Sequence, residues 1–210
     1  LKAKVAIGIQ RGYQRVAGPI VATETKDSKI FELNWGNAFE TYSKIVNEQS
    51  NSKITKDDFF NVSKGYPLGI TRKGYEDIVR DPISVKERGT LNCIDDIPEN
   101  EALYMLKGEP ARLIESAKVS WQEAIDDVTG NPSSCLFIDC VTRVLHLGDD
   151  FTKEIGQIAN DNKIFTMQAQ IGYEAEFMLF GKRRKLDPKK GIKKWAVITS
   201  RLLHDTVDKP

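Results

Sequence analysis

The sequence is poor in the residues that build metal sites and disulfide frameworks. It has three cysteines and two histidines among 210 residues, and their spacing matches no zinc-binding pattern. The odd, sparse cysteine count favours reduced thiols and therefore a cytoplasmic location. Cys135 and Cys140 would lie on opposite faces of a strand, which disfavours a disulfide between them. We therefore expect no metal and no other cofactor.

Long apolar runs, a charge excess and phosphate-loop motifs are also missing. No apolar stretch is long enough to span a membrane, so we expect no membrane insertion. The net charge of +1 predicts no strong attraction to nucleic acid. Gly8, Gly12 and Gly18 lack the spacing of a Gly-rich phosphate loop, and no Gly-Lys-Ser/Thr occurs. These absences argue against a nucleic-acid-binding protein and a P-loop nucleotide site.

What the chain does have is a globular composition, with 40% hydrophobic and 29% charged residues, and clear helical patterns. Apolar residues at helical spacing predict main helices over residues 37–49, 109–127 and 149–160. Pro110 suits the first turn of the second helix, and Asp149 is expected to cap the third. A shorter helix is expected after residue 55.

Shorter runs of apolar and β-branched residues predict strands between turn signals such as Asp81-Pro82. The predicted strands cover residues 3–9, 19–24, 28–33, 66–72, 76–80, 90–95, 101–106, 135–141, 164–170, 172–180 and 194–200. Several links between them are too short for a crossover. The sequence therefore predicts an α+β fold of mixed, mainly antiparallel β-sheets packed against three main helices. Trp35, Trp121 and Trp195 are expected in its core.

The segment from Ser134 to Arg143 is the most informative one. Its apolar residues predict one buried strand, and Cys140 and Arg143 follow where that strand ends. Ligand-facing groups are often placed at strand ends, where a rigid scaffold meets a loop. This pattern predicts that a thiol and a guanidinium are presented together.

Several segments, taken in their order, resemble the FIST sensory domain, and above all its C-terminal half. They are Gly18-Pro19-Ile20-Val21-Ala22-Thr23, Ile78-Val79-Arg80-Asp81, Gly89-Thr90-Leu91, Ile97-Pro98-Glu99-Asn100, the cysteine-x-x-arginine segment from Leu136 to Arg143, and Gln170 to Phe177. The family's Gly-Glu-Ile reads Ala175-Glu176-Phe177 here. The resemblance implies that residues 1–36 are the last strands of the N-terminal half and that residues 37–210 form a FIST C-type domain.

This resemblance also implies a function. Family members are cytoplasmic signal-input modules that sense small molecules, amino acids among them, and act on a kinase or another output domain. We therefore expect a non-catalytic sensory module that binds a small ligand, an amino acid or a small carboxylate. Two alternatives stay open: a protein-recruitment module, as in F-box proteins, and a Cys140-dependent enzyme.

Arg80 and Arg143 are the first candidates for ligand contacts, because a guanidinium holds a carboxylate with two hydrogen bonds. The alternative is that each arginine closes a structural ion pair, with Asp81 or Asp139 as a neighbour. Cys140 is either a reactive thiol or a small buried hydrophobic residue. The only histidines, His146 and His204, give it no obvious base.

The C-terminal third supplies the remaining candidates. Glu174 and Glu176 would share one strand face, either solvated or facing a pocket, and Tyr173 would face the opposite side. If Glu176 points into a pocket with Arg143, the two match the opposite charges of an amino acid. The basic stretch 182–194 is either a solvated loop or a surface for an acidic partner. The predicted ligand-binding residues are Arg80, Cys140, Arg143, Tyr173 and Glu176.

Overall fold

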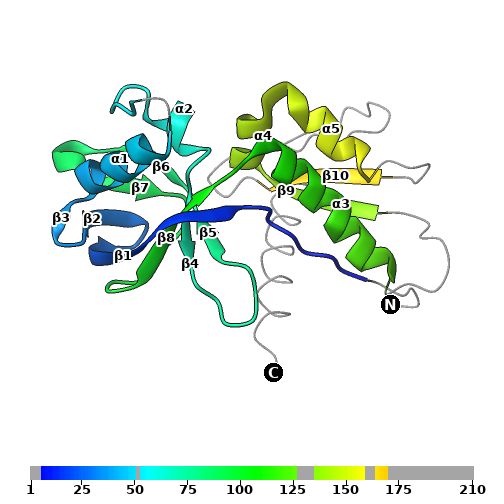
Figure 1. Ribbon diagram of the computed structural model, residues 1–210, viewed down its shortest axis with the longest axis horizontal. Coiled ribbons are helices and arrows are strands. Elements are labelled where there is room, and N and C mark those ends of the chain that lie inside the picture. Colours follow the sequence, from blue (N-terminus) through cyan, green and yellow to red (C-terminus); the bar gives the residue numbers. More distant parts are fainter. Residues whose placement is uncertain (1–5, 51–52, 127–134, 159–163, 170–210) are drawn as a thin grey trace, which may run out of the picture. The chain divides into compact units, whose positions relative to one another are not determined.

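The computed structural model describes residues 6–50, 53–126, 135–158 and 164–169 (Figure 1). The chain divides into two compact units. The first comprises Leu1–Pro132 and Thr142–Asn160, and the second comprises Ser133–Val141 and Asp161–Pro210. The boundary at residues 36 and 37 between the two family halves stays a prediction.

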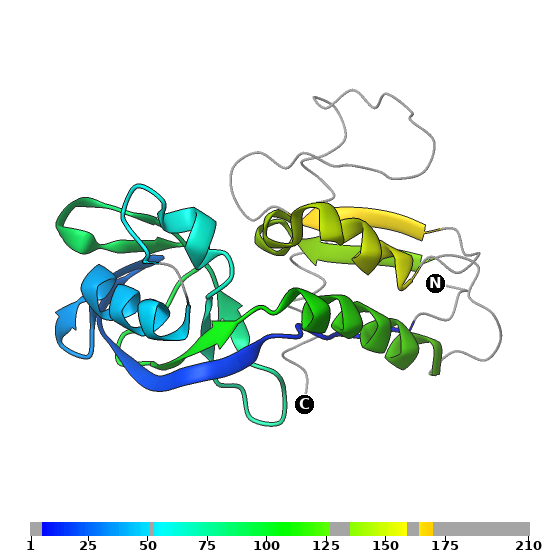
Figure 2. The ribbon, with the colours of Figure 1, turned by 45° about the horizontal axis from the view of Figure 1, so that its top comes forward.

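An eight-stranded antiparallel sheet dominates the first unit (Figure 2). Its strands are β1 (Gln14–Lys26), β2 (Lys29–Leu33), β3 (Gly36–Asn37), β4 (Leu68–Ile70), β5 (Ile78–Arg80), β6 (Pro82–Val85), β7 (Leu91–Cys93) and β8 (Ala102–Lys107). The strand order is β5-β4-β8-β1-β2-β7-β6, and β3 pairs with β2. Only Asp81 separates β5 from β6, although these strands end the order on opposite sides. The sheet therefore curls into a nearly closed barrel.

The long strand β1 makes this curvature possible. Its first half pairs with β8 and its second half pairs with β2. The register shifts between Arg15 and Ile20 and again between Ala22 and Thr25. Such irregularities bend a strand and increase its twist, so β1 passes from one side of the barrel to the other.

Helices cover the barrel and form a second layer beside it. They are α1 (Ala38–Gln49), α2 (Phe59–Ser63), α3 (Pro110–Asp126), α4 (Val141–Leu147) and α5 (Phe151–Gly156). Asn37 caps α1, because its side chain accepts a hydrogen bond from the Glu40 amide at 3.2 Å. Within the second layer, α3 packs against α5.

The barrel core contains apolar side chains from the strands and from α1. Its largest fully buried members include Tyr42, Ile20, Ile30, Leu33, Leu68, Leu91, Leu103 and Met105. Tyr42 buries its ring and donates its hydroxyl to the Tyr66 carbonyl at 2.6 Å. An apolar face on α1 and alternating strand residues thus meet in one core, as the sequence pattern predicts.

The second unit contains β9 (Cys135–Cys140), which pairs in parallel with β10 (Ile164–Ala169). Parallel neighbours need a crossover connection, usually through a helix. The chain therefore leaves the strand at Cys140 and enters α4 at once. The prediction that Val141 extends the strand is wrong, and Arg143 lies on a helix instead of at a strand end.

The structure confirms the predicted fold class, an α+β fold with mainly antiparallel strands and three main helices. The strand predicted at 3–9 is wrong over residues 6–9, which have no strand partner in the described chain and lie against α3. Strand β6 is missed by the sequence pattern, because Asp81-Pro82 reads as a turn. Proline is nevertheless tolerated at the first position of a strand. The strands predicted at 172–180 and 194–200 lie outside the described residues.

Two smaller expectations also need correction. Asp149 does not begin the third helix: residues 148–150 form a 3₁₀ turn, and α5 begins at Phe151. The chain is already helical there because α4 precedes it, so no separate cap is needed. Trp35 is not a core residue but is 78% exposed, at the turn between β2 and β3. Trp195 lies outside the described residues.

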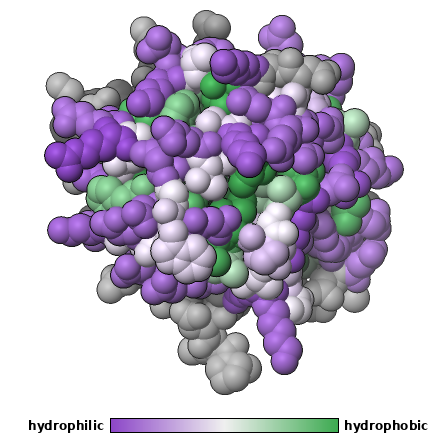
Figure 3. Space-filling model, turned by 60° about the vertical axis from the view of Figure 1, so that its left-hand side comes forward, coloured by the Kyte–Doolittle hydropathy of each residue, from purple (hydrophilic) through white to green (hydrophobic). Residues whose placement is uncertain are grey.

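No helix in the described ranges is both long and apolar enough to cross a membrane. The molecular face in Figure 3 is covered mainly by hydrophilic side chains, and hydrophobic residues show there in several separate areas.

Candidate functional site

A cavity of about 240 Å³ opens where the chain enters the barrel. Its polar lining comes from residues 11–15 and from the loop between β4 and β5, and its apolar lining comes from Val79 and Leu106. We name it the Arg11 cavity, after one of its lining residues. Its volume is below the range of about 300–1,000 Å³ that is usual for ligand pockets, so it suits a small metabolite better than a nucleotide.

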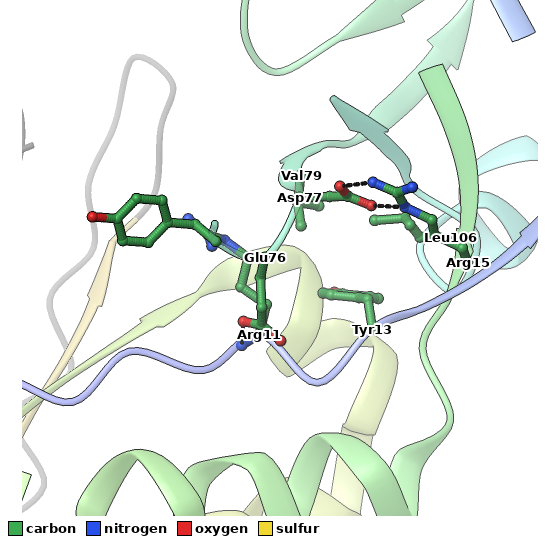
Figure 4. Close-up of a pocket in the computed structure, with 8 residues that line it drawn as sticks. Arg11, Tyr13, Arg15, Glu76, Asp77, Val79 and Leu106 are labelled. Carbon is green, nitrogen blue, oxygen red and sulfur yellow. Dashed lines mark hydrogen bonds and ion pairs between the residues drawn. The ribbon is translucent and has the colours of Figure 1, made fainter. Parts of the chain in front are cut away.

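Two arginines and two acids face this space (Figure 4). The Arg15–Asp77 pair lies on one side of the cavity, and Arg11 and Glu76 lie on the other. Arg11, Tyr13 and Arg15 alternate along the chain. Gly12, between Arg11 and Tyr13, has φ +74° and so departs from extended geometry, and Arg15 belongs to β1; all three residues line the cavity.

Arg15 and Asp77 neutralise each other. The guanidinium donates from Nε to the carboxylate at 2.5 Å and forms a second bond to it from Nη2. Arg15 also donates to the Thr71 hydroxyl at 2.9 Å and lies 3.8 Å from the centre of the Tyr104 ring. The hydrogen bond to Asp77 raises the pKa of Arg15. With Nε and Nη2 engaged in these bonds, Arg15 forms a fixed wall of the cavity.

Glu76 instead binds the main chain. Its carboxylate accepts hydrogen bonds from the amides of Arg11, at 2.6 Å, and Gly12, at 3.4 Å. Among the described residues, no cation forms an ion pair with Glu76, and none of the described side chains pairs with the Arg11 guanidinium. The Arg11 cavity therefore presents one positive and one negative group whose charges are not neutralised by a neighbour within the described part of the chain.

A buried charge network contacts the Arg11 main chain through its carbonyl group. The Arg143 side chain is 7% exposed and pairs with Glu154 of α5, which is fully buried. Arg143 also donates to the Ser116 hydroxyl at 2.9 Å and to the Leu113 carbonyl, both on α3. Its Nη1 donates to the carbonyl oxygen of Arg11 at 2.6 Å.

The structure places Arg80 and Arg143 in different settings. Arg80, on β5, lies 3.5 Å from the Asp95 carboxylate and donates to the Asp96 carbonyl at 2.8 Å. Each arginine thus contacts an acid, Asp95 for Arg80 and Glu154 for Arg143. Neither arginine lines the Arg11 cavity.

The other predicted ligand residues are placed as follows. Cys140 is the last residue of β9 and is exposed, with no disulfide. Tyr173 and Glu176 lie outside the described residues, as do Glu174, His204 and the basic stretch 182–194. Direct ligand contact by Arg80, Cys140, Arg143, Tyr173 and Glu176 stays a prediction.

Sequence reasoning missed the residues of the Arg11 cavity. The N-terminal segment (residues 6–13) looks like the start of a strand in sequence, so Arg11 and Tyr13 received no role. Arg11, Tyr13 and Arg15 stand at every second position, but strand-like alternation does not hold across Gly12, whose φ is +74°, so this spacing was not a sufficient signal. Glu76 and Asp77 stand in a loop, and nothing in the sequence shows which segment that loop meets.

Metal and nucleophile chemistry finds little support in the described part of the chain. No group of three or more His, Cys, Asp and Glu side chains there is arranged to hold a metal ion. The Nε2 atom of His146 lies 2.7 Å from the Gly108 carbonyl, so it carries a proton and donates it. That nitrogen cannot act as a base.

Comparison with known protein families gives one match. The family model of the FIST C domain matches residues 38–167, more than half of the chain. No curated protein and no solved structure matches the sequence.

Proposed function

Because the chain belongs to the FIST C domain family of sensory and signalling domains, we propose that it is a signal-input module that binds a small carboxylate, with an α-amino acid as the preferred class. The Arg11 cavity is the proposed binding site. Bound ligand would favour one conformation of the domain and so change the activity of an attached output domain or kinase. A ligand shifts such an equilibrium only if it binds one conformation more tightly than the other.

One observation carries this proposal. Arg11 lines a cavity, and its guanidinium forms no ion pair with any residue that the structure describes. A guanidinium is well suited to bind a carboxylate with two parallel hydrogen bonds. Glu76, on the same side of the cavity, supplies the negative charge that an ammonium group needs.

The test is a binding screen with a matched pair of variants. Thermal unfolding is followed with the common amino acids and with acetate and succinate, and the strongest ligand is then titrated by calorimetry. Arg11→Gln is compared with Arg112→Gln, which removes an exposed arginine on α3 that does not line the cavity. Hydrogen bonds to charged groups contribute about 1.5–3 kcal/mol, so Arg11→Gln should weaken binding roughly 10- to 100-fold. Arg112→Gln should not change it.

Glu76→Gln separates the two ligand classes. It removes the negative charge while keeping a side-chain oxygen for the Arg11 and Gly12 amides. Amino-acid binding should weaken, whereas acetate binding should stay the same or improve. Equal ligand-induced stabilisation in wild type and Arg11→Gln would exclude the Arg11 cavity as the site.

A further inference from the structure

Two side chains hold the main chain of Arg11, one through its amide and one through its carbonyl group. The Arg11 amide donates to Glu76 at 2.6 Å, and the Arg11 carbonyl accepts from Arg143 at 2.6 Å. The proposed ligand-binding acid and the buried arginine therefore hold the same residue through its main chain. Both bonds act on one residue, so a displacement of the Arg11 main chain affects both of them.

Arg143 is itself firmly fixed. Its acceptors come from three separate places: the N-terminal segment, α3 and α5. The guanidinium is planar and rigid, so bonds on one edge determine the direction of its other donors. Glu154 and Ser116 therefore determine where Arg143 aims Nη1, and this donor in turn determines where the Arg11 carbonyl lies.

The remaining contacts of the N-terminal segment also bring it against α3. Gly12 has φ +74° and packs on Ser116, and Gly8 packs on the main chain of Ser120. Further along the segment, the Ile9 amide donates to Glu123 at 3.3 Å. The N-terminal segment thus contacts α3 from Gly8 to Gly12, and Arg143 binds this segment at Arg11, the residue that lines the cavity.

We propose that the buried Arg143–Glu154 pair positions Arg11 for ligand and couples occupancy of the Arg11 cavity to α3 and α5. This inference rests on the proposed function of the cavity. Arg143 and Glu154 are positioning residues, because they act through the Arg11 main chain. A ligand ammonium group that approaches Glu76 competes with the Arg11 amide, and the resulting displacement of Arg11 changes the hydrogen bond between its carbonyl oxygen and Arg143.

Arg143→Lys is the informative variant. Lysine keeps the charge that Glu154 needs, so the fold should be retained. A single ammonium group, however, cannot reproduce the fork that reaches Ser116, Glu154 and the Arg11 carbonyl together. The matched control is Lys118→Arg, which changes the cation of an exposed ion pair with Glu115 on α3.

The first measurement is residue-resolved amide hydrogen exchange by NMR in the absence of ligand. In Arg143→Lys, exchange at Arg11 and Gly12 should be at least about tenfold faster, while the barrel amides keep their wild-type rates. Lys118→Arg should match wild type throughout. Unchanged exchange at Arg11 and Gly12 in the folded Arg143→Lys protein would overturn the positioning role.

The second measurement is the affinity for glycine, the simplest probe that carries both charges. We expect Arg143→Lys to weaken it about tenfold and Lys118→Arg to leave it unchanged. Faster exchange with unchanged glycine affinity would overturn the coupling to the cavity. Failure of wild type to bind glycine would count against both the proposed function and the coupling, whereas the exchange comparison would still decide the positioning role.

Discussion

Gly12 lies so close to Ser116 that position 12 has no room for a side chain. A Cβ atom there would be 2.6 Å from the Ser116 hydroxyl oxygen and 3.0 Å from the Arg112 carbonyl oxygen. The backbone also has φ +74°, which only glycine adopts readily. This contact sets the distance between the N-terminal segment and α3, one residue away from Arg11.

Gly12→Ala should therefore be clearly more destabilising than Gly74→Ala. Gly74 has φ +81°, and a Cβ atom at that position would meet no other atom within 4 Å, so it reports backbone strain alone. We expect Gly74→Ala to lower the free energy of unfolding by about 1–2 kcal/mol. Gly12→Ala should lower it by about a further 1–3 kcal/mol because of overpacking. Urea denaturation measures both, and equal losses would show that the contact can relax.

Removing one partner of the buried Arg143–Glu154 pair should lower the free energy of unfolding much more than replacing both partners. Arg143→Met leaves a fully buried Glu154 without its cation and should lower the free energy of unfolding by about 3–5 kcal/mol. The double variant Arg143→Met/Glu154→Leu should recover most of this loss. A surface comparison is Lys118→Met, which should change stability by less than about 1 kcal/mol. A double variant as unstable as the single one would argue against a pairing role for Glu154.

The three thiols should react with iodoacetamide in a defined order. Burial, with a smaller effect from the Asp81 carboxylate, raises the pKa of the Cys93 thiol to about 12. At pH 8 only about one Cys93 in ten thousand is then a thiolate, and thiolate is the reactive form. Cys140 is exposed and should be labelled first, and Cys135, whose pKa burial also raises, should follow. Peptide mapping by mass spectrometry gives the order.

The same experiment addresses the Cys140-dependent enzyme that the sequence left open. A Cys140 labelling rate equal to that of a free thiol in a short peptide is the expected result for a sensory module. A rate much above it at pH 6 would indicate an activated thiol and would revive the alternative. Cys140→Ser supplies the background for assigning the labelled peptide.

Alkaline pH should destabilise the fold from about pH 9 upward. The folded pKa of Cys93 is raised above its ordinary value, so the folded state holds this proton when the unfolded state has lost it. The stabilising contribution is complete below pH 9 and is lost as pH rises toward 12, by up to about 1.4 kcal/mol per pH unit. Burial also raises the pKa of Tyr42 well above its ordinary value, which adds a second loss above pH 10.

Cys93→Ala isolates the first contribution. Between pH 8 and pH 10 its unfolding free energy should fall less steeply than that of wild type, whatever its absolute stability. Denaturation curves at half-unit pH steps measure the slopes. Parallel slopes would mean that Cys93 does not control the alkaline response.

The local spacing of apolar residues predicted most of the helices and strands. It failed where the secondary structure of a segment depends on which other segment it packs against. α1 and α3 were predictable because their apolar stripes and their first-turn residues agree. Apolar residues alternate over residues 6–9 as in a strand, yet this segment packs against the outside of helix α3 and pairs with no strand in the described chain. Arg143 was predicted to contact a ligand at a strand end; the ligand contact stays a prediction, and its location on α4 follows from the parallel pairing of β9 with β10.

The candidate site was harder to predict for the same reason. The Arg11 cavity joins residues 11–15 to a loop more than 50 positions further along the chain. Only the tertiary fold brings Glu76 to the Arg11 amide. Sequence alone could show neither that Arg11, Tyr13 and Arg15 line one cavity, because Gly12 departs from extended geometry, nor what faces them.

The near-closure of the sheet limits how another polypeptide can attach to it. Its outermost strands, β5 and β6, contain only three and four residues and are joined through Asp81. Such short edge strands leave few unpaired main-chain groups for β-augmentation by a strand of another protein. An effector that responds to a conformational change of this barrel would therefore have to bind its helices, loops or side chains.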